Sequence, residues 1–236
     1  FKSPPYLYSL DTIQMDANSN FGYTLDQTLD IIQKLYEKGF VTYPRTDSQF
    51  LPEDMFNSIQ KIHKMLKTNG YGELFNQDAE AVNMAKHKSL FFNDSKVGSH
   101  YAIIPTEQAP SGLSADEKKI YGLIVDSVIR MLYPDARFEK TKAVTSVNGE
   151  EFITNGSALA EKGWMFVHGN SKEELLPALE MGDSVQADCK ISAKKTEPPK
   201  TYTDKTLLAA MKTAGKDLED EDLRKLMAEQ KIEGIG

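Results

Sequence analysis

Cysteine is nearly absent from this sequence, and other features that mark particular protein classes are missing too. The 236 residues include one cysteine, Cys189, so neither a disulfide framework nor a cysteine-based zinc site is expected. No apolar run approaches the roughly 18 residues of a membrane helix. The first residues also lack the apolar core and cleavage site of a signal peptide. We therefore expect a cytoplasmic protein without a membrane partner.

Positive charge is also in short supply, because 28 Lys and Arg face 35 Asp and Glu, for a net charge of −7. Affinity for duplex DNA comes largely from cations that neutralise phosphates. The composition therefore argues against a protein that coats duplex DNA, although a small basic site remains compatible with it. Neither G-x-x-x-x-G-K-[ST] nor G-x-G-x-x-G occurs, so an ATPase or dinucleotide fold has no support. We expect no small-molecule substrate.

Acidic residues are plentiful, but they are not arranged as a metal site. Five carboxylates fall between residues 217 and 222, just after Gly215. Acidic side chains are favoured in the first turn of a helix by the helix dipole. We interpret this run as the solvated start of a helix and expect no metal site within the chain.

The pattern of the first 136 residues predicts helices joined by short strands, in a winged-helix-like domain. Thr24 with Gln27, and Ser114 with Glu117, form capping-box patterns that begin helices. Another helix is predicted from Pro52, with an apolar face at helical spacing. The helix that begins at Thr24 should end at Gly39.

The remainder of the chain predicts a second and a third domain, so the fold class is α+β. Residues 137–197 alternate in polarity and contain Asn148-Gly149, a hairpin-turn signal. Residues 163–169 and 183–195 predict further strands, giving a partial antiparallel β-rich arch domain. Residues 198–236 form a short helical segment in which Thr203 caps one helix and the acidic run begins the last.

The ten residues GFVTYPRTDS, 39–48, contain the first candidate site. A tyrosine after a short strand at 40–42 is usually a packed residue. Here Pro44 ends the strand, and Arg45 offers a planar fork of donors suited to phosphate. Three short polar residues follow: Thr46, Asp47 and Ser48. A phenol is a poor nucleophile at neutral pH unless a cation or base assists it, so Tyr43 beside Arg45 could attack a phosphodiester.

His100 is the second candidate because it follows Gly98-Ser99 and directly precedes the apolar residues 101–105. A loop of this kind presents side chains into a cleft, although a single histidine more often has a structural role. The other histidines have simpler interpretations. His63 lies on the edge of a helical face and packs, His87 is in a charged stretch, and His168 precedes a turn glycine.

Several segments together resemble the type IA DNA topoisomerases, most closely their topoisomerase III branch. GFVTYPRTDS resembles the family's active-site signature around Y-P-R-T-D, and NDSKVGSHYAIIPT resembles its H-x-A-I-I-P-T segment. SADEKKIYGLIVDSVIRMLYPDARF, GSALAEKGWMF and PPKTYTDKTLLAAM follow in the family's order. The resemblance extends over essentially the whole chain.

The resemblance implies a mechanism and roles for particular residues. Tyr43 matches the nucleophile that opens one DNA strand and keeps the 5′ phosphate as a phosphotyrosine. Arg45 and His100 match residues that contact this phosphate, and Asp47 is expected to orient them. Thr46, Ser48 and Ser99 are expected to contact DNA. The family reseals the DNA without ATP after another strand has passed through the gap.

The chain also departs from the family's pattern. Nothing matches the family's Toprim domain, which supplies the Mg²⁺-binding carboxylates and a catalytic Glu. We therefore expect a piece of a longer enzyme, inactive alone, with Mg²⁺ held outside this chain. The expected partner is DNA, mainly single-stranded, with a helicase as a further partner and a nucleoid location if the source is bacterial.

Two alternatives remain at this point. A non-catalytic winged-helix module would bind duplex DNA, yet the helix after Pro52 carries few cations. A different tyrosine transesterase, such as a recombinase, would usually gather several Arg and His residues before a late Tyr, whereas here the Tyr comes early. The two chemistries differ in polarity, because a recombinase would leave a 3′ phosphotyrosine.

Overall fold

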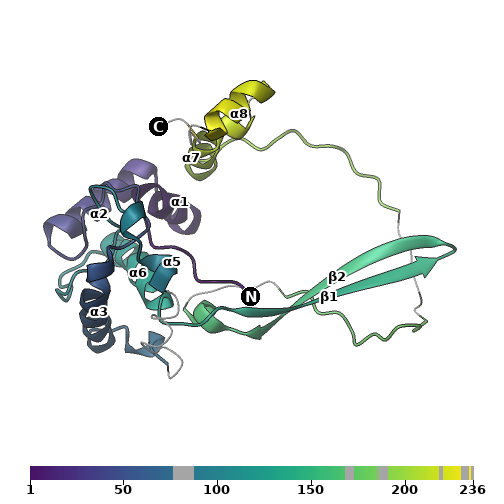
Figure 1. Cartoon of the computed structure of the whole chain (residues 1–236), viewed down its shortest axis with the longest axis horizontal. Coiled ribbons are helices and arrows are strands. Elements are labelled where there is room, and N and C mark those ends of the chain that lie inside the picture. The colour runs from purple at the N-terminus through teal and green to yellow at the C-terminus, as the bar shows by residue number, and fades with distance from the viewer. Residues whose placement is uncertain are drawn as a thin grey trace.

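A computed structural model describes residues 1–76, 88–167, 173–184, 186, 191–217, 220–229 and 234. The chain first forms a helical body, from which a long two-stranded hairpin projects (Figure 1). Residues 191–203 then lead back along an extended path to two short helices, the first of which lies beside the first helix of the body. The α+β class predicted from the sequence is confirmed. The domain boundaries stay a prediction.

The helical body contains the three helices that the sequence predicts from Thr24, Pro52 and Ser114, together with helices whose bounds were not predicted. Its helices are α1 (Leu10–Phe21), α2 (Leu25–Glu37), α3 (Phe56–Thr68), α5 (Lys88–Phe91) and α6 (Ala115–Arg130). Thr24 and Gln27 form the predicted capping box, with hydrogen bonds of 3.1 and 2.9 Å. Ser114 and Glu117 do the same at the start of α6. The helix predicted from Pro52 begins as a 3₁₀ turn (Glu53–Met55) before α3.

The core of the body lies where α6 is surrounded by the other elements. Ile120, Ile124 and Val128 of α6 are fully buried, as are Ile59 of α3 and Leu35 of α2. Apolar residues at i, i+4 and i+8 place one face of a helix against its neighbours. Because this core is built from several helices, it provides a rigid support for the loops that they carry.

The segments of the body that were predicted as short strands do not form strands. Residues 40–42 and 101–105 contribute only isolated bridges, Val41 to Pro105 and Tyr8 to Ile103. Pro44 and Pro105 lack the amide donor that a continuing ladder requires. The segments are extended and largely buried, but residues 40–42 pair at one position, and residues 101–105 pair at two positions with two different segments.

The hairpin is formed by β1 (Arg137–Val147) and β2 (Glu150–Glu161), which are antiparallel, with Val144 opposite Ile153. Asn148 and Gly149 have φ of 53° and 89°, as the predicted Asn-Gly turn requires. Ser157 exchanges two backbone hydrogen bonds, of 2.8 and 2.9 Å, with Glu174, so a third segment starts to pair along β2.

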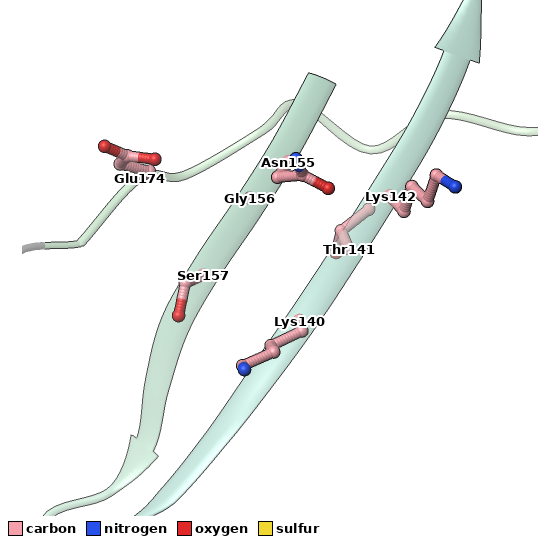
Figure 2. Close-up of a pocket in the computed structure, with 7 residues that line it drawn as sticks. All are labelled: Lys140, Thr141, Lys142, Asn155, Gly156, Ser157 and Glu174. Carbon is pink, nitrogen blue, oxygen red and sulfur yellow. The ribbon is translucent and has the colours of Figure 1, made fainter. Parts of the chain in front are cut away.

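An open hollow of about 410 Å³ lies along the hairpin, where the segment containing Glu174 approaches the two strands (Figure 2). Lys140 and Lys142 line it from β1, and Asn155, Gly156 and Ser157 line it from β2. A side chain at Gly156 would meet Leu176, at 2.7 Å from its Cγ, so glycine permits this close approach. None of the site residues predicted from the sequence lines this hollow.

The prediction of two further strands was wrong where the structure describes them. Residues Gly163–Phe166 form a 3₁₀ helix, while residues 168 and 169 lie outside the described part. Gly163 has φ of 49° and turns the chain back, so that the Trp164 indole donates to the Lys2 carbonyl at 2.8 Å. The described residues among 183–195 contain no strand, and Cys189 is outside them.

The C-terminal helices are α7 (Asp204–Lys212) and α8 (Glu221–Glu229). Thr203 caps α7 as predicted. α7 lies against α1, where Lys212 forms an ion pair with Asp11 and the Lys205 ammonium donates to the Ser19 hydroxyl at 3.1 Å. Within the described ranges, no helix has the length and apolar character that a bilayer crossing requires.

His63 is a packing residue of the body, as its position on the helix predicts. Its side chain is buried between α3 and α6, with Nε2 3.1 Å from the carbonyl oxygen of Val128. Burial lowers its pKa from about 6.5 to about 4, although the hydrogen bond to Val128 opposes this shift. The folded protein therefore keeps a neutral imidazole at a pH where the unfolded chain already binds a proton.

We expect the free energy of unfolding to fall as pH drops below about 6.5, the usual pKa of His in an unfolded chain, with up to about 3 kcal/mol lost by pH 4. Stability is lost as the pH falls because His63 in the unfolded chain binds a proton at a higher pH than His63 in the folded protein. Urea unfolding at pH 7.5 and pH 5, followed by the fluorescence of the single tryptophan, Trp164, measures it. A His63→Gln variant should lose less stability over this range. An equal loss in both proteins would contradict the prediction.

Candidate functional site

The chain enters the candidate site through a defined helix ending. At the end of α2, the amide of Gly39 donates to the Tyr36 carbonyl at 2.8 Å, and the amide of Phe40 donates to the Leu35 carbonyl at 2.9 Å. These two bonds form a Schellman motif, in which the residue at Gly39 adopts a left-handed conformation. Its φ is indeed 77°. Phe40 and Leu35 are both buried, so the direction of the chain toward Tyr43 is set by α2.

We expect Gly39→Ala to destabilise the body by about 1–2 kcal/mol, because an L-residue pays this cost in the left-handed region. Crowding adds little, since the new Cβ would lie 3.0 Å from the end of the flexible Gln108 side chain. Urea unfolding of the variant measures the change, with Gly98→Ala as the control. Gly98 has open space around it and no positive φ. Equal stability of the two variants would show that the Schellman turn is not needed.

Thr42 then joins this segment to the one that follows His100. Its amide donates to the Ile104 carbonyl, its hydroxyl donates to the Ala102 carbonyl, and the Ile104 amide donates to that hydroxyl, each at 3.0 Å. The three hydrogen bonds of this threonine therefore join the segment before Tyr43 to the segment after His100, where a continuous β-ladder is not formed. The sequence did not lead us to predict a role for Thr42. Its position directly before the candidate nucleophile is the feature that could have indicated one.

The result is that Tyr43 and His100 meet. Their ring centroids are 4.3 Å apart, with an angle of 38° between the planes. A third ring, that of Tyr36, packs edge-on against Tyr43 at 5.6 Å and 80°. Tyr43 is half-buried, whereas Tyr36 and His100 are exposed. The phenol is therefore held between neighbouring groups at the surface rather than enclosed in the core.

Thr46 and Ser48 lie inside the loop. Both are buried, at 5% and 6% exposure. The Thr46 hydroxyl donates to the His100 carbonyl at 3.4 Å and accepts from the Ser48 amide at 3.1 Å. The Ser48 hydroxyl donates to the Lys96 carbonyl at 3.1 Å. These contacts hold the two loops together; that either residue contacts DNA stays a prediction.

Arg45, Asp47 and Ser99 point outward instead. All three are exposed, and within the described part of the chain none of their side chains makes a hydrogen bond or ion pair. The guanidinium of Arg45 thus remains available to an anion near Tyr43. Asp47 was expected to orient the phosphate-binding residues, but the structure shows no such bond from it to Arg45 or His100.

No metal site is found in the described residues, where no group of three or more His, Cys, Asp or Glu side chains could hold an ion. In the acidic run, Asp220 accepts hydrogen bonds from the amides of Asp222 and Leu223 at 2.9 and 3.1 Å. The prediction of a helix start is therefore confirmed. The placement of Mg²⁺ outside this chain stays a prediction, and His87 and His168 lie outside the described residues.

Comparison with known proteins identifies the family. The DNA topoisomerase family model matches residues 1–236. DNA topoisomerase 3 of Haemophilus influenzae is 34% identical over 245 residues, covering 100% of this chain and 37% of the relative. That of Bacillus subtilis is 34% identical, covering 92% of this chain and 32% of the relative. The chain thus spans about a third of these relatives.

A solved structure has the same fold. Full-length topoisomerase I from Thermotoga maritima superposes with a TM-score of 0.68 at 24% identity, over 97% of this chain and 38% of that one. At this identity the likeness concerns the fold alone, and it agrees with the family match along the sequence. Because the family model matches every residue of this chain and the DNA topoisomerase 3 relatives match nearly all of it, the chain belongs to the type IA DNA topoisomerases, in their topoisomerase III branch.

Proposed function

We propose that this chain is the tyrosine-bearing part of a longer topoisomerase, in which Tyr43 cleaves one DNA strand. The observation that carries this proposal is the contact of the Tyr43 ring with His100, at 4.3 Å, beside the exposed Arg45. A half-exposed phenol with a histidine ring packed on it and an arginine two residues further on suits attack on a phosphodiester. A tyrosine that served only the core would be enclosed by apolar groups.

The proposed reaction is a transesterification. The Tyr43 Oη forms a bond to phosphorus while the bond from phosphorus to the 3′ oxygen breaks, and the phenolic proton is passed on so that the leaving group departs as a 3′ hydroxyl. Arg45 and His100 donate to the phosphoryl oxygens, where negative charge develops. The reverse attack by the 3′ hydroxyl reseals the strand after another has passed, so no ATP is required.

Further parts of the proposal follow from the family. The substrate is DNA, mainly in single-stranded form, and a helicase is the proposed protein partner. Mg²⁺ is proposed to bind a part of the enzyme outside this chain, since the described residues offer no fitting donor set. We accordingly propose that residues 1–236 alone do not cleave DNA, and that the enzyme works in the cytoplasm.

The test is to trap the full-length protein on single-stranded DNA with Mg²⁺, denature it and digest it with trypsin. Cleavage after Lys38 and Arg45 releases residues 39–45, which contain one tyrosine. DNA labelled at its 3′ end should remain on this peptide, whereas DNA labelled at its 5′ end should be released. Retention of the 5′ label would indicate a 3′ phosphotyrosine and the recombinase chemistry. Label on another peptide would remove Tyr43 from the reaction.

A further inference from the structure

We propose that Tyr36 is a positioning residue for the reaction, one that holds the Tyr43 ring in the orientation needed for attack. This inference rests on the proposed function of Tyr43. The Tyr36 ring meets the Tyr43 ring edge-on, with centroids 5.6 Å apart and an angle of 80°. Aromatic pairs favour this arrangement, because the positive edge of one ring faces the negative face of the other.

The backbone makes Tyr36 a fixed support. Tyr36 is in the last turn of α2, and its carbonyl accepts the amide of Gly39 in the Schellman turn. The same turn leads into the segment that carries Tyr43. Both rings therefore project from one short, hydrogen-bonded stretch of chain whose geometry is set by the buried pair Leu35 and Phe40.

Tyr36 contributes little to the core. Its side chain is 40% exposed, whereas the buried residues of α2 are Thr28, Ile32 and Leu35. Within the described residues its hydroxyl makes no hydrogen bond. The contact of this ring with the Tyr43 ring therefore depends on the ring rather than on the hydroxyl.

This assigns different tasks to the two neighbours of the phenol. His100 packs closely on the Tyr43 ring, with centroids 4.3 Å apart, and carries the ring nitrogens that are proposed to donate to the phosphate. Tyr36 contacts Tyr43 through its ring, and this contact limits the rotation of the Tyr43 side chain toward solvent. Since an error of about 1 Å in the position of a reacting group can slow a reaction about 100-fold, such support should affect the rate of cleavage rather than DNA affinity.

The test uses the full-length enzyme with Tyr36→Ala and Tyr36→Phe, and measures single-turnover cleavage of a single-stranded oligonucleotide at saturating concentration. Tyr36→Ala should cleave about 10-fold more slowly, with the dissociation constant of the oligonucleotide and the melting temperature unchanged. Tyr36→Phe should keep the wild-type rate. Asp30→Ala, which shortens another exposed side chain of α2, is the matched control and should also keep it.

Each other outcome is informative. Weaker binding with an unchanged saturated rate would make Tyr36 a base-stacking residue, and a large fall in melting temperature would make it structural; either result overturns the proposal. Failure of Tyr36→Phe to restore the rate would do the same by assigning the role to the hydroxyl. If wild type links DNA to Tyr43 while Tyr36→Ala cleaves normally, this inference alone fails. If wild type links DNA elsewhere, the proposed function fails as well.

Discussion

Tyr43→Phe in the full-length enzyme is expected to eliminate the covalent complex with DNA, with cleavage below detection. The substitution removes one oxygen, the atom proposed to bond to phosphorus, and keeps the ring that packs between His100 and Tyr36. Since no hydrogen bond from the Tyr43 hydroxyl is found in the described residues, the fold should be unaffected. Denaturing gels with DNA labelled at its 3′ end measure the complex, and a binding assay measures affinity.

The matched control for this variant is Tyr36→Phe, which removes the same atom from the adjacent ring and should stay active. DNA affinity of Tyr43→Phe should equal that of wild type, because the oxygen is needed for the chemistry and not for packing. A covalent complex that survives in Tyr43→Phe would require another nucleophile and would refute the proposed function.

Arg45→Ala is expected to slow cleavage at saturating DNA by about 10²–10³-fold, the usual cost of removing one donor that stabilises developing charge. Arg45 is two residues beyond Tyr43 and exposed, and its side chain has no ion-pair partner in the described part of the chain. Its charge is thus available to a phosphate. Arg45→Lys should recover only part of the rate, because an ammonium lacks the planar fork of donors.

The control for charge is Arg137→Ala. This arginine lies on the hairpin, where Glu139 and Glu161 already pair with it, so its loss should leave the cleavage rate within about 2-fold, as expected for an exposed ion pair. If Arg45→Ala lowered DNA affinity but kept the saturated rate, Arg45 would be a binding residue without a part in the reaction.

Local elements were predictable because their signals lie within a few residues. The capping boxes at Thr24 and Ser114 depend on a side chain three positions away, and the Asn148-Gly149 turn depends on the φ angles of two residues. The extended segments were not predictable in this way. Residues 40–42 form one bridge, and residues Gly163–Phe166 form a 3₁₀ helix. A segment becomes a strand only where a second strand pairs with it along its length, and the local sequence does not show whether one will.

The features of the candidate site also fall into those that the local sequence predicts and those that depend on tertiary contacts. The sequence alone determined the family signature, the nucleophile candidate Tyr43, its neighbour Arg45 and the glycine at the end of α2, because these depend on residue types at short spacing. Only the tertiary structure decided that the Tyr43 ring lies between His100 and Tyr36, that Thr42 joins the two loops, and that Thr46 and Ser48 are buried. The contacts of Tyr43 and Thr42 with residues 100–104 join segments far apart in the chain, and their geometry follows from how the helical body packs, which no local pattern encodes. The contact between Tyr36 and Tyr43 spans fewer residues and depends on the turn at Gly39.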